Sequence, residues 1–321
     1  MQAKRQVYKK QCALSRMRIL VTGGAGFIGS HLCEALAKEG HAVTVIDDLS
    51  SGSIENLPRG VALAQLSITD DLTSVFEKTK PQAIFHLAAQ IDVRKSLENP
   101  ALDAKVNILG SLNLLDTANR FGCKRIIFSS TGGALYGETD RRPTSETHST
   151  RPESPYGIAK LAVEGYLRVY ARLHGFSVCV LRYANVYGPR QALKSEAGVV
   201  ALFIKQILAE KQCIIFGDGR QTRDYVYVAD VVEANLAALG NELQGTFNIG
   251  TGVETSVNEL YTLIARELDF PWKAQHGPAV KGELQNSCLQ IEAISKHWRP
   301  DWRLERGIAA TVAWFRERTK K

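Results

Sequence analysis

A tyrosine and a lysine stand four residues apart in Tyr156-Gly-Ile-Ala-Lys160, directly after Pro155. If this segment begins a helix, the two side chains share one face. A phenol with a pKa near 10 is a poor base at pH 7, but an ammonium group one turn away favours the phenolate. Tyr156 is therefore a candidate proton acceptor from a substrate hydroxyl, with Lys160 as its partner. Because the same spacing also occurs by chance in surface pairs, it needs support from elsewhere in the chain.

A glycine-rich segment, Gly23-Gly-Ala-Gly-Phe-Ile-Gly29, follows an apolar run that is typical of a buried strand. Such glycines allow a tight turn, close approach of the backbone to a pyrophosphate and close packing of a helix on the strand. A second apolar run ends at Asp47, whose carboxylate would accept hydrogen bonds from ribose hydroxyls and repel a 2′-phosphate. The arrangement predicts an NAD site and disfavours NADP. Asp48 is either a second contact there or a solvated turn residue.

These candidate residues require a framework of alternating strands and helices. Short apolar runs alternate with helix-length segments at 42–46, 61–66, 83–87, 125–129 and 177–181. The alternation predicts a Rossmann-type α/β fold with a doubly wound parallel sheet, which binds ligands at the carboxyl ends of its strands.

The rhythm changes after about residue 190. We expect an NAD-binding domain over 17–190, with return segments near 225–250, and a smaller C-terminal α/β lobe over 191–321 that binds the substrate. Within this lobe the periodicity predicts short strands and helices at 213–216, 245–249, 198–209, 256–268 and 304–318.

Charge is unevenly distributed along the chain. The formal net charge is +7, and residues 1–16 carry five basic residues and no acidic one. We interpret this segment as a basic disordered extension; the remainder is nearly neutral, which argues against nucleic-acid binding. No apolar run approaches the roughly 18 residues of a membrane span. The six cysteines are scattered. They predict reduced thiols in a cytoplasmic protein, and their spacing predicts no metal site. The lack of a long apolar run predicts no membrane contact.

Further motifs surround the tyrosine–lysine pair and the glycine loop. They are GGAGFIGS (23–30), HLAA (86–89), SSTGGALYG (129–137), SPYGIAK (154–160), LRYANVYGPRQ (181–191), GDGRQTRDYVYVAD (217–230), FNIGTG (247–252) and GELQNSCL (282–289). With these motifs the chain resembles the NAD-dependent epimerase/dehydratase family of extended short-chain dehydrogenases/reductases, and within it the UDP-glucose 4-epimerases. The resemblance runs from Met17 to about Trp302.

The resemblance implies an isomerase that inverts C4 of a UDP-hexose. Tyr156 would take the proton of the 4-hydroxyl while hydride leaves C4 for NAD, and the 4-keto sugar would be reduced on its other face. Lys160 would hold the nicotinamide ribose. Thr131 would hydrogen-bond O4, with Ser130 as the alternate, because the TGGALYG loop is one residue longer than the common form. UDP-glucose and UDP-galactose are the implied pair, and the small Ser287 leaves room for their N-acetylated forms.

The resemblance also implies a set of cofactor contacts. Besides Tyr156 and Lys160, they are Gly23, Gly26, Phe27, Ile28, Gly29, Asp47, Leu87, Ala88, Ala89 and Asn107. The position facing adenine is commonly Asp followed by an aliphatic residue. Here it is Ser67-Ile68, whose serine can still accept a hydrogen bond.

For the nucleotide sugar, the family pattern matches Asn185 near the diphosphate, Phe216 on the base and Arg223 as a phosphate clamp. A second clamp arginine is usual two residues before the glycine of GELQ. This chain has Val280 there, followed by Lys281. A lysine offers a point charge in place of a bidentate fork, so the pyrophosphate contacts are expected to differ.

Other functions are weighed on the same residues. The dehydratase branch needs an Asp-Glu pair after the central Ser/Thr, and the loop here is Thr131-Gly-Gly-Ala. A UDP-uronate or pentose 4-epimerase shares the machinery and is the alternative enzyme. A non-catalytic NAD-binding sensor typically loses the tyrosine or the lysine. The resemblance further implies a homodimer through helices at 101–121 and 154–174.

Overall fold

The computed structural model describes residues 16–191, 198–240, 242–280 and 284–319. The basic extension predicted for residues 1–16 therefore lies, except for Arg16, outside the described residues. Within these ranges, no helix is both long enough and apolar enough to cross a bilayer.

A parallel sheet of seven strands forms the centre of the molecule, in the order β3-β2-β1-β4-β5-β6-β11. Its strands are β1 (Arg18–Thr22), β2 (Ala42–Ile46), β3 (Ala62–Ala64), β4 (Ala83–His86), β5 (Arg125–Thr131), β6 (Ser177–Tyr183) and β11 (Gly245–Ile249). The order reverses at β1, where Thr22 lies opposite Ile46 of β2 and His86 of β4. Ligands bind at such a reversal in doubly wound sheets.

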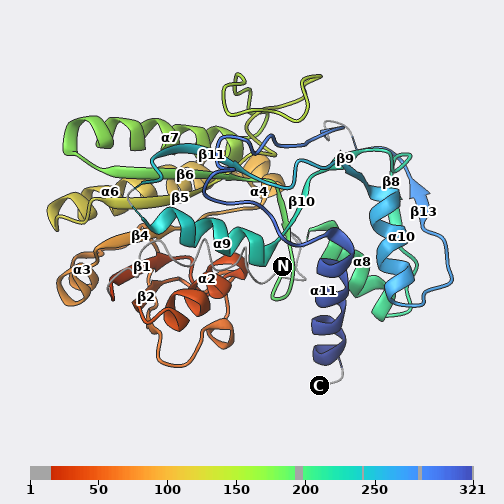
Figure 1. Cartoon of the computed structure of the whole chain (residues 1–321), viewed down its shortest axis with the longest axis horizontal. Helices are drawn as coiled ribbons and strands as arrows, with labels where there is room; N and C mark the ends of the chain where they lie inside the picture. The colour runs from red at the N-terminus through yellow and green to blue at the C-terminus, as the bar shows by residue number, and fades with distance from the viewer. Residues whose placement is uncertain (1–15, 192–197, 241, 281–283, 320–321) are drawn as a thin grey trace.

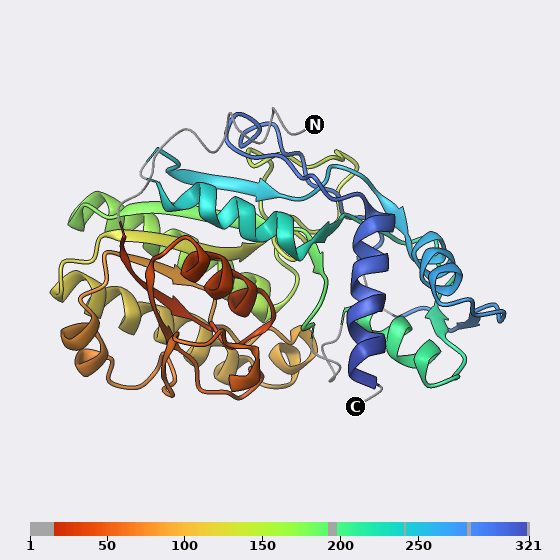
Figure 2. The same ribbon diagram turned by 60° about the horizontal axis from the view of Figure 1, so that its bottom comes forward.

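Helices cover both faces of this sheet (Figures 1 and 2). The first face carries α2 (Phe27–Lys38) and α9 (Val228–Leu239). The second face carries α3 (Thr73–Thr79), α6 (Gly110–Arg120) and α7 (Pro155–His174). Because successive side chains of a strand point to opposite faces, Ile127 belongs to the first core and its neighbours Ile126 and Phe128 to the second.

Three short helical segments link β4 to α6. They are α4 (Val93–Glu98), α5 (Pro100–Ala104) and the π-helix η2 (Lys105–Leu109). The Asp92 side chain accepts a hydrogen bond from the Lys95 amide and so caps α4. Asn99 caps α5 in the same way, with Pro100 in the first turn, where its missing N–H costs nothing. All three segments pack against α7.

A smaller lobe is built from three helices and pairs of short strands. Its elements are β7 (Asn185–Tyr187), α8 (Val199–Leu208), β8 (Ile214–Phe216), β9 (Thr222–Arg223), β10 (Tyr225–Tyr227), β12 (Thr255–Ser256), α10 (Val257–Glu267), β13 (Gln275–Gly277) and α11 (Leu304–Thr319). The helices α8, α10 and α11 share one apolar core at one end of the molecule (Figure 1). A capping box between Ser256 and Glu259 starts α10.

The predicted α/β class with a doubly wound parallel sheet is confirmed. The strand expected at 245–249 is β11, and it extends the main sheet beside β6. The helix that precedes it, α9, packs against α2. Chain from beyond residue 190 therefore completes the sheet that begins with β1.

Candidate active site

The glycine loop between β1 and α2 leaves no room for side chains. Gly23 has a φ of +71°, and a Cβ on it would lie 2.7 Å from the Ala88 amide nitrogen. A Cβ on Gly29 would lie 2.1 Å from the Gly23 carbonyl oxygen. Gly26 precedes Phe27 and Ile28 at the N-terminus of α2 and has no side chain to cap it. The loop is a bare main-chain surface at a helix N-terminus, which suits a pyrophosphate.

The two acidic residues after β2 differ in their surroundings. Asp47 is buried and accepts hydrogen bonds from the Ala25 and Leu49 amides, at 2.9 Å each. Burial raises the pKa of this carboxyl. Asp48 is exposed and accepts hydrogen bonds from the amide and hydroxyl of Ser50. Asp47 is thus joined to the glycine loop, whereas Asp48 caps its own turn.

Ser67 and Ile68 lie after β3, at the position predicted to face adenine. The Ser67 hydroxyl is 2.9 Å from the Thr69 hydroxyl, and the Ser67 amide donates to the Asp70 carboxylate. The Ile68 side chain is buried in the core against Gly110, where a Cβ would come within 2.8 Å of it. Ile68 is therefore a packing residue, and Ser67 stabilises its own turn.

The segment Leu87–Ala89, directly after β4, is positioned by hydrogen bonds of buried polar side chains. Ser111 donates to the Asn107 carbonyl oxygen, so His86 Nε2 donates to Ser111 at 2.9 Å and His86 Nδ1 accepts from Thr22 at 2.7 Å. Burial lowers the pKa of His86 to about 3, and Lys160 adds to this shift. The Thr22 hydroxyl also accepts from the Ala88 amide, 3.2 Å away. A neutral histidine thus orders the Leu87–Ala89 segment.

Asn107 contacts this segment through both atoms of its amide. Its Oδ1 accepts from the Gln90 amide at 2.8 Å, and its Nδ2 donates to the Gln90 carbonyl and to Asp103 Oδ1 at 2.9 Å each. The predicted cofactor contact Asn107 therefore holds the chain that follows Ala89. Asn107 is the buried residue of the π-helix η2.

The tyrosine–lysine pair lies at the start of α7. Ser154 caps this helix, and the first turn contains Tyr156. The buried Lys160 donates from Nζ to the Ser129 carbonyl at 2.9 Å, and its Nζ lies 5.9 Å from the Tyr156 ring centroid. Burial lowers the pKa of Lys160 to about 8 and raises the pKa of Tyr156. Lys160 thus lies at the carboxyl end of β5, next to the residue that precedes Ser130 and Thr131, and Tyr156 lies one helical turn before it.

The two hydroxyls at the end of β5 have different partners. Ser130 is buried and donates to Glu164 Oε1 at 2.6 Å. Arg182 binds both oxygens of Glu164, at 2.9 and 2.6 Å, and also donates to the Tyr136 hydroxyl. Thr131 is only partly buried and accepts from the Ala134 amide, which leaves its own O–H to donate.

Predicted substrate contacts gather around the loop after Thr131. A Cβ on Gly133 would lie 3.9 Å from Asn185 Oδ1, and a Cβ on Gly132 would meet the Leu289 side chain. The Ser287 amide donates to the Thr222 carbonyl. The structure therefore brings Asn185 and the segment with Ser287 next to the end of β5.

The remaining predicted contacts lie in the smaller lobe. Phe216 ends β8 and is 47% exposed, as a residue that stacks on a ligand ring can be. Arg223 in β9 donates to the Thr222 and Gln285 carbonyls. Val280 is exposed, and Lys281 lies outside the described residues.

The sequence did not lead us to several buried acids, among them Glu164 and Asp224. Glu164 could have been found one turn after Lys160 on the same helix face. Asp224, inside the GDGRQTRDYVYVAD motif, accepts from the amides of Thr251, Gly252 and Leu289, and burial raises its pKa. It thereby ties the start of β10 to the FNIGTG and GELQNSCL segments.

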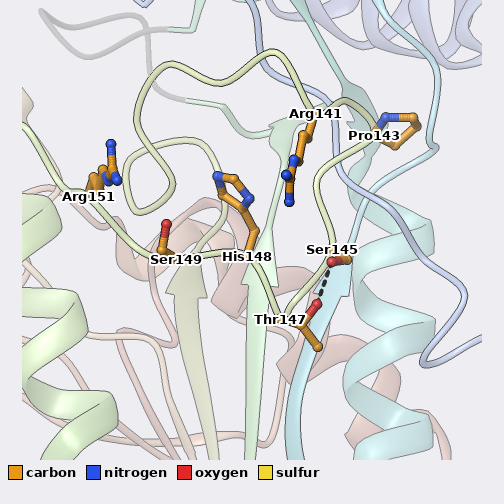
Figure 3. Close-up of a pocket in the computed structure, with 7 residues that line it drawn as sticks. All are labelled: Arg141, Pro143, Ser145, Thr147, His148, Ser149 and Arg151. Carbon is orange, nitrogen blue, oxygen red and sulfur yellow. Dashed lines mark hydrogen bonds between the residues drawn. The ribbon is translucent and has the colours of Figure 1, made fainter.

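A solvent-open hollow of about 400 Å³ lies on the long loop between β5 and α7 (Figure 3). It is lined by Arg141, Pro143, Ser145, Thr147, His148, Ser149 and Arg151. None of the predicted site residues contributes to it. Across the described ranges, no group of three potential metal ligands comes together.

Comparisons with known proteins identify the family of this chain. The family described as "NAD dependent epimerase/dehydratase family" matches residues 19–250. A UDP-glucose 4-epimerase of Mycolicibacterium smegmatis is 44% identical over 313 residues, covering 95% of this chain and all of the relative.

Solved structures show the same likeness. A Thermotoga maritima UDP-glucose 4-epimerase with UDP-glucose is 47% identical, with a TM-score of 0.92 over 94% of this chain and 100% of that one. A Thermus thermophilus UDP-glucose 4-epimerase in complex with NAD is 41% identical, with a TM-score of 0.89 over 94% and 99%. The family match over residues 19–250 and these relatives show that the chain belongs to the NAD-dependent epimerase/dehydratase family.

Proposed function

We propose that this chain catalyses the NAD-dependent 4-epimerisation of a UDP-hexose, with UDP-glucose and UDP-galactose as its substrate pair. The observation that carries the proposal is the placing of Tyr156, Lys160 and Thr131 at the end of β5, in a sheet whose first strand leads into a bare glycine loop. The relatives from M. smegmatis and T. maritima, which are named UDP-glucose 4-epimerases, support the substrate class.

The glycine loop fits NAD because a side chain at Gly23 or Gly29 would collide with the main chain. The Gly26 amide donates to the Gly23 carbonyl and so closes the turn, and the amides of Phe27 and Ile28 would hold the pyrophosphate. Asp47 would accept the ribose hydroxyls through lone pairs that its two amide contacts leave free. When bound, NAD supplies the acceptor and donor of the hydride at C4 of the sugar.

Proton transfer belongs to the protein. Tyr156 takes the proton of the 4-hydroxyl as hydride leaves C4, and it returns the proton when the 4-keto sugar is reduced on its opposite face. Because burial raises the pKa of Tyr156, the phenol holds its proton at neutral pH in the protein alone. The cationic charges of Lys160 and of the oxidised nicotinamide ring act in the opposite direction. Thr131, with its free O–H, hydrogen-bonds O4.

The test is to incubate the purified protein separately with UDP-glucose, UDP-N-acetylglucosamine and UDP-glucuronate, with and without added NAD. We expect UDP-glucose to yield UDP-galactose, identified by NMR at C4. The Tyr156→Phe variant should still bind NAD and lose turnover by orders of magnitude. Conversion of UDP-glucuronate alone would instead support the alternative epimerase, and a Tyr156→Phe variant with wild-type behaviour would support an NAD-binding sensor.

We further propose that the protein is a homodimer. Helix α7 exposes four apolar side chains on one stripe, at Ile158, Tyr166, Val169 and Leu173. The neighbouring segments expose Ile91, Val93, Leu97, Leu102 and Leu109. Because these segments pack against α7, we propose that the side chains form a shared apolar surface, and burying such a surface against its own copy is the usual route to a twofold dimer.

A cytoplasmic location is proposed from the cysteines. Cys33, Cys123, Cys179, Cys213 and Cys288 are all free and buried. Five unpaired thiols are typical of a reducing compartment.

A further inference from the structure

A buried carboxylate next to the catalytic pair has an unused oxygen. Asp103 in α5 is 1% exposed. Its Oδ1 accepts hydrogen bonds from Gln90 Nε2 and Asn107 Nδ2, at 2.9 Å each. Its Oδ2 has no hydrogen-bond partner in the described part of the chain. An unsatisfied buried carboxylate oxygen is costly, so its retention calls for a reason outside the packing of α5.

Among the buried charged side chains near Asp103, Lys160 is the cation that lacks an ion pair in the described residues. Helix α7, which packs against α5, brings Tyr156, Lys160 and Glu164 to this region. Both oxygens of Glu164 are bound by Arg182, so that carboxylate is already balanced. Lys160 has no ion pair within 4 Å among the described residues.

The other titratable side chains near Asp103 are neutral, paired or exposed to solvent. His86 is neutral at physiological pH because its pKa is lowered to about 3. Asp92 on α4 accepts from the Lys95 amide and lies 3.9 Å from Lys95 Nζ. The remaining charged side chains of α4, η2 and the middle of α7 are exposed: Arg94, Lys95, Glu98, Lys105 and Arg168.

We infer that Asp103 is a positioning residue whose buried carboxylate, more than 4 Å away, is the counter-charge of Lys160 and keeps the ammonium protonated beside Tyr156, while the Ser129 carbonyl fixes the position of the ammonium. The inference rests on the proposed roles of Tyr156 and Lys160. It concerns a residue that binds neither cofactor nor sugar and acts through the lysine.

The direction of the electrostatic effects supports this role. Burial lowers the pKa of Lys160 to about 8, and the Asp103 carboxylate opposes that fall more than Glu164 does. The same carboxylate raises the pKa of Tyr156. Asp103 therefore shifts both groups in one direction, and it sets the pH range in which a protonated lysine can stand beside an ionised tyrosine.

The test replaces the carboxylate by an amide of the same size in Asp103→Asn. Its Oδ1 can still accept from Gln90 and Asn107, so the change removes mainly the charge. The Lys160 titration is followed through the ¹³Cε signal of labelled lysine, assigned by its loss in Lys160→Arg. We expect the Lys160 midpoint to fall by about one pH unit or more, and both limbs of the pH–rate profile to move to lower pH.

Controls separate charge from structure. Asp103→Glu, which keeps the charge, should retain the wild-type profile. Asp269→Asn makes the same chemical change at an exposed position with a φ of 53°, which asparagine tolerates, and should change neither measurement. If Asp103→Asn does not fold, Asp103→Ser provides a second neutral variant.

An unchanged Lys160 midpoint in a folded neutral variant would overturn the inference and leave Asp103 a structural residue. A wild-type protein without epimerase activity would instead contradict the proposed function. Because the lysine titration needs no turnover, the two failures are distinguishable.

Discussion

Ser130 and Thr131 are adjacent hydroxyls with opposite hydrogen-bonding states. The Ser130 hydroxyl donates its hydrogen bond to Glu164. The Thr131 hydroxyl accepts from the Ala134 amide, and its O–H has no acceptor among the described residues. The family resemblance left both as candidates for the contact to O4. Which hydroxyl is free depends on the position of Glu164, eight residues along α7 from Tyr156, and the spacing of the loop does not reveal it.

We expect Thr131→Val to lower kcat by about a hundredfold, because it removes a hydrogen-bond donor at the reacting oxygen. Ser130→Ala should reduce the free energy of unfolding by about 2 kcal/mol, since it deletes a hydrogen bond to a charged group, and should lower kcat far less. Steady-state kinetics and urea unfolding measure the two effects. Thr131→Ser is the control that should recover activity, and a larger kcat loss in Ser130→Ala would reverse the assignment.

The size of the side chain at Ser287 is expected to decide which sugars the site accepts. Ser287 is partly buried, and because its side chain is small we expect it to leave space for a C2 substituent. Ser287→Tyr should therefore abolish turnover of UDP-N-acetylglucosamine before that of UDP-glucose, as measured by kcat/KM for each. Ser287→Ala should leave both unchanged, and equal losses for the two sugars in Ser287→Tyr would contradict the pocket argument.

Among the elements, α7 is the one that joins catalysis to the fold. It carries Tyr156, Lys160 and Glu164 on one side, and Glu164 is bound to Arg182 of β6 in a buried ion pair of 2.6 Å. Breaking such a pair from one side leaves an uncompensated buried charge. The middle of α7 is thus held against the central strands by charge as well as by apolar packing.

We expect Arg182→Met to reduce the free energy of unfolding by about 3–5 kcal/mol. Arg142→Met is the matched control, because Arg142 pairs with Glu254 at 3.1 Å in a more exposed place and should cost about 1 kcal/mol or less. Urea unfolding measures both. Similar losses in the two variants would mean that the buried pair has no special role.

Most elements could be predicted from the sequence, because each is encoded by its own periodicity. The helix expected at 256–268 is α10 at Val257–Glu267, and the strand expected at 177–181 is β6 at Ser177–Tyr183. Contacts between distant segments could not be predicted in this way. The bond of Asn107 to Gln90 depends on a π-helical turn, which leaves no mark in apolar spacing.

On the scale of the whole molecule, the shared apolar surface of α4, α5, η2 and α7 is the feature that the monomer leaves unexplained. Leu97 and Leu173 are 60% and 62% exposed. We expect the wild-type protein to have the mass of a dimer by light scattering, and the Leu97→Glu/Leu173→Glu variant to be a folded monomer. Val253→Glu, at a residue 61% exposed in the smaller lobe, is the control that should remain dimeric.

The position of β11 has a consequence for folding during synthesis on the ribosome. Strand β6 is complete at residue 183, yet its outer neighbour is not translated until residues 245–249. Until then the nascent chain exposes the unpaired edge of β6 and an apolar face that α9 later covers. Both features favour association with other chains. A chain truncated near residue 190 would keep this strand edge and this apolar face exposed. The two lobes therefore cannot be produced as separate proteins by dividing the chain where the apolar pattern changes.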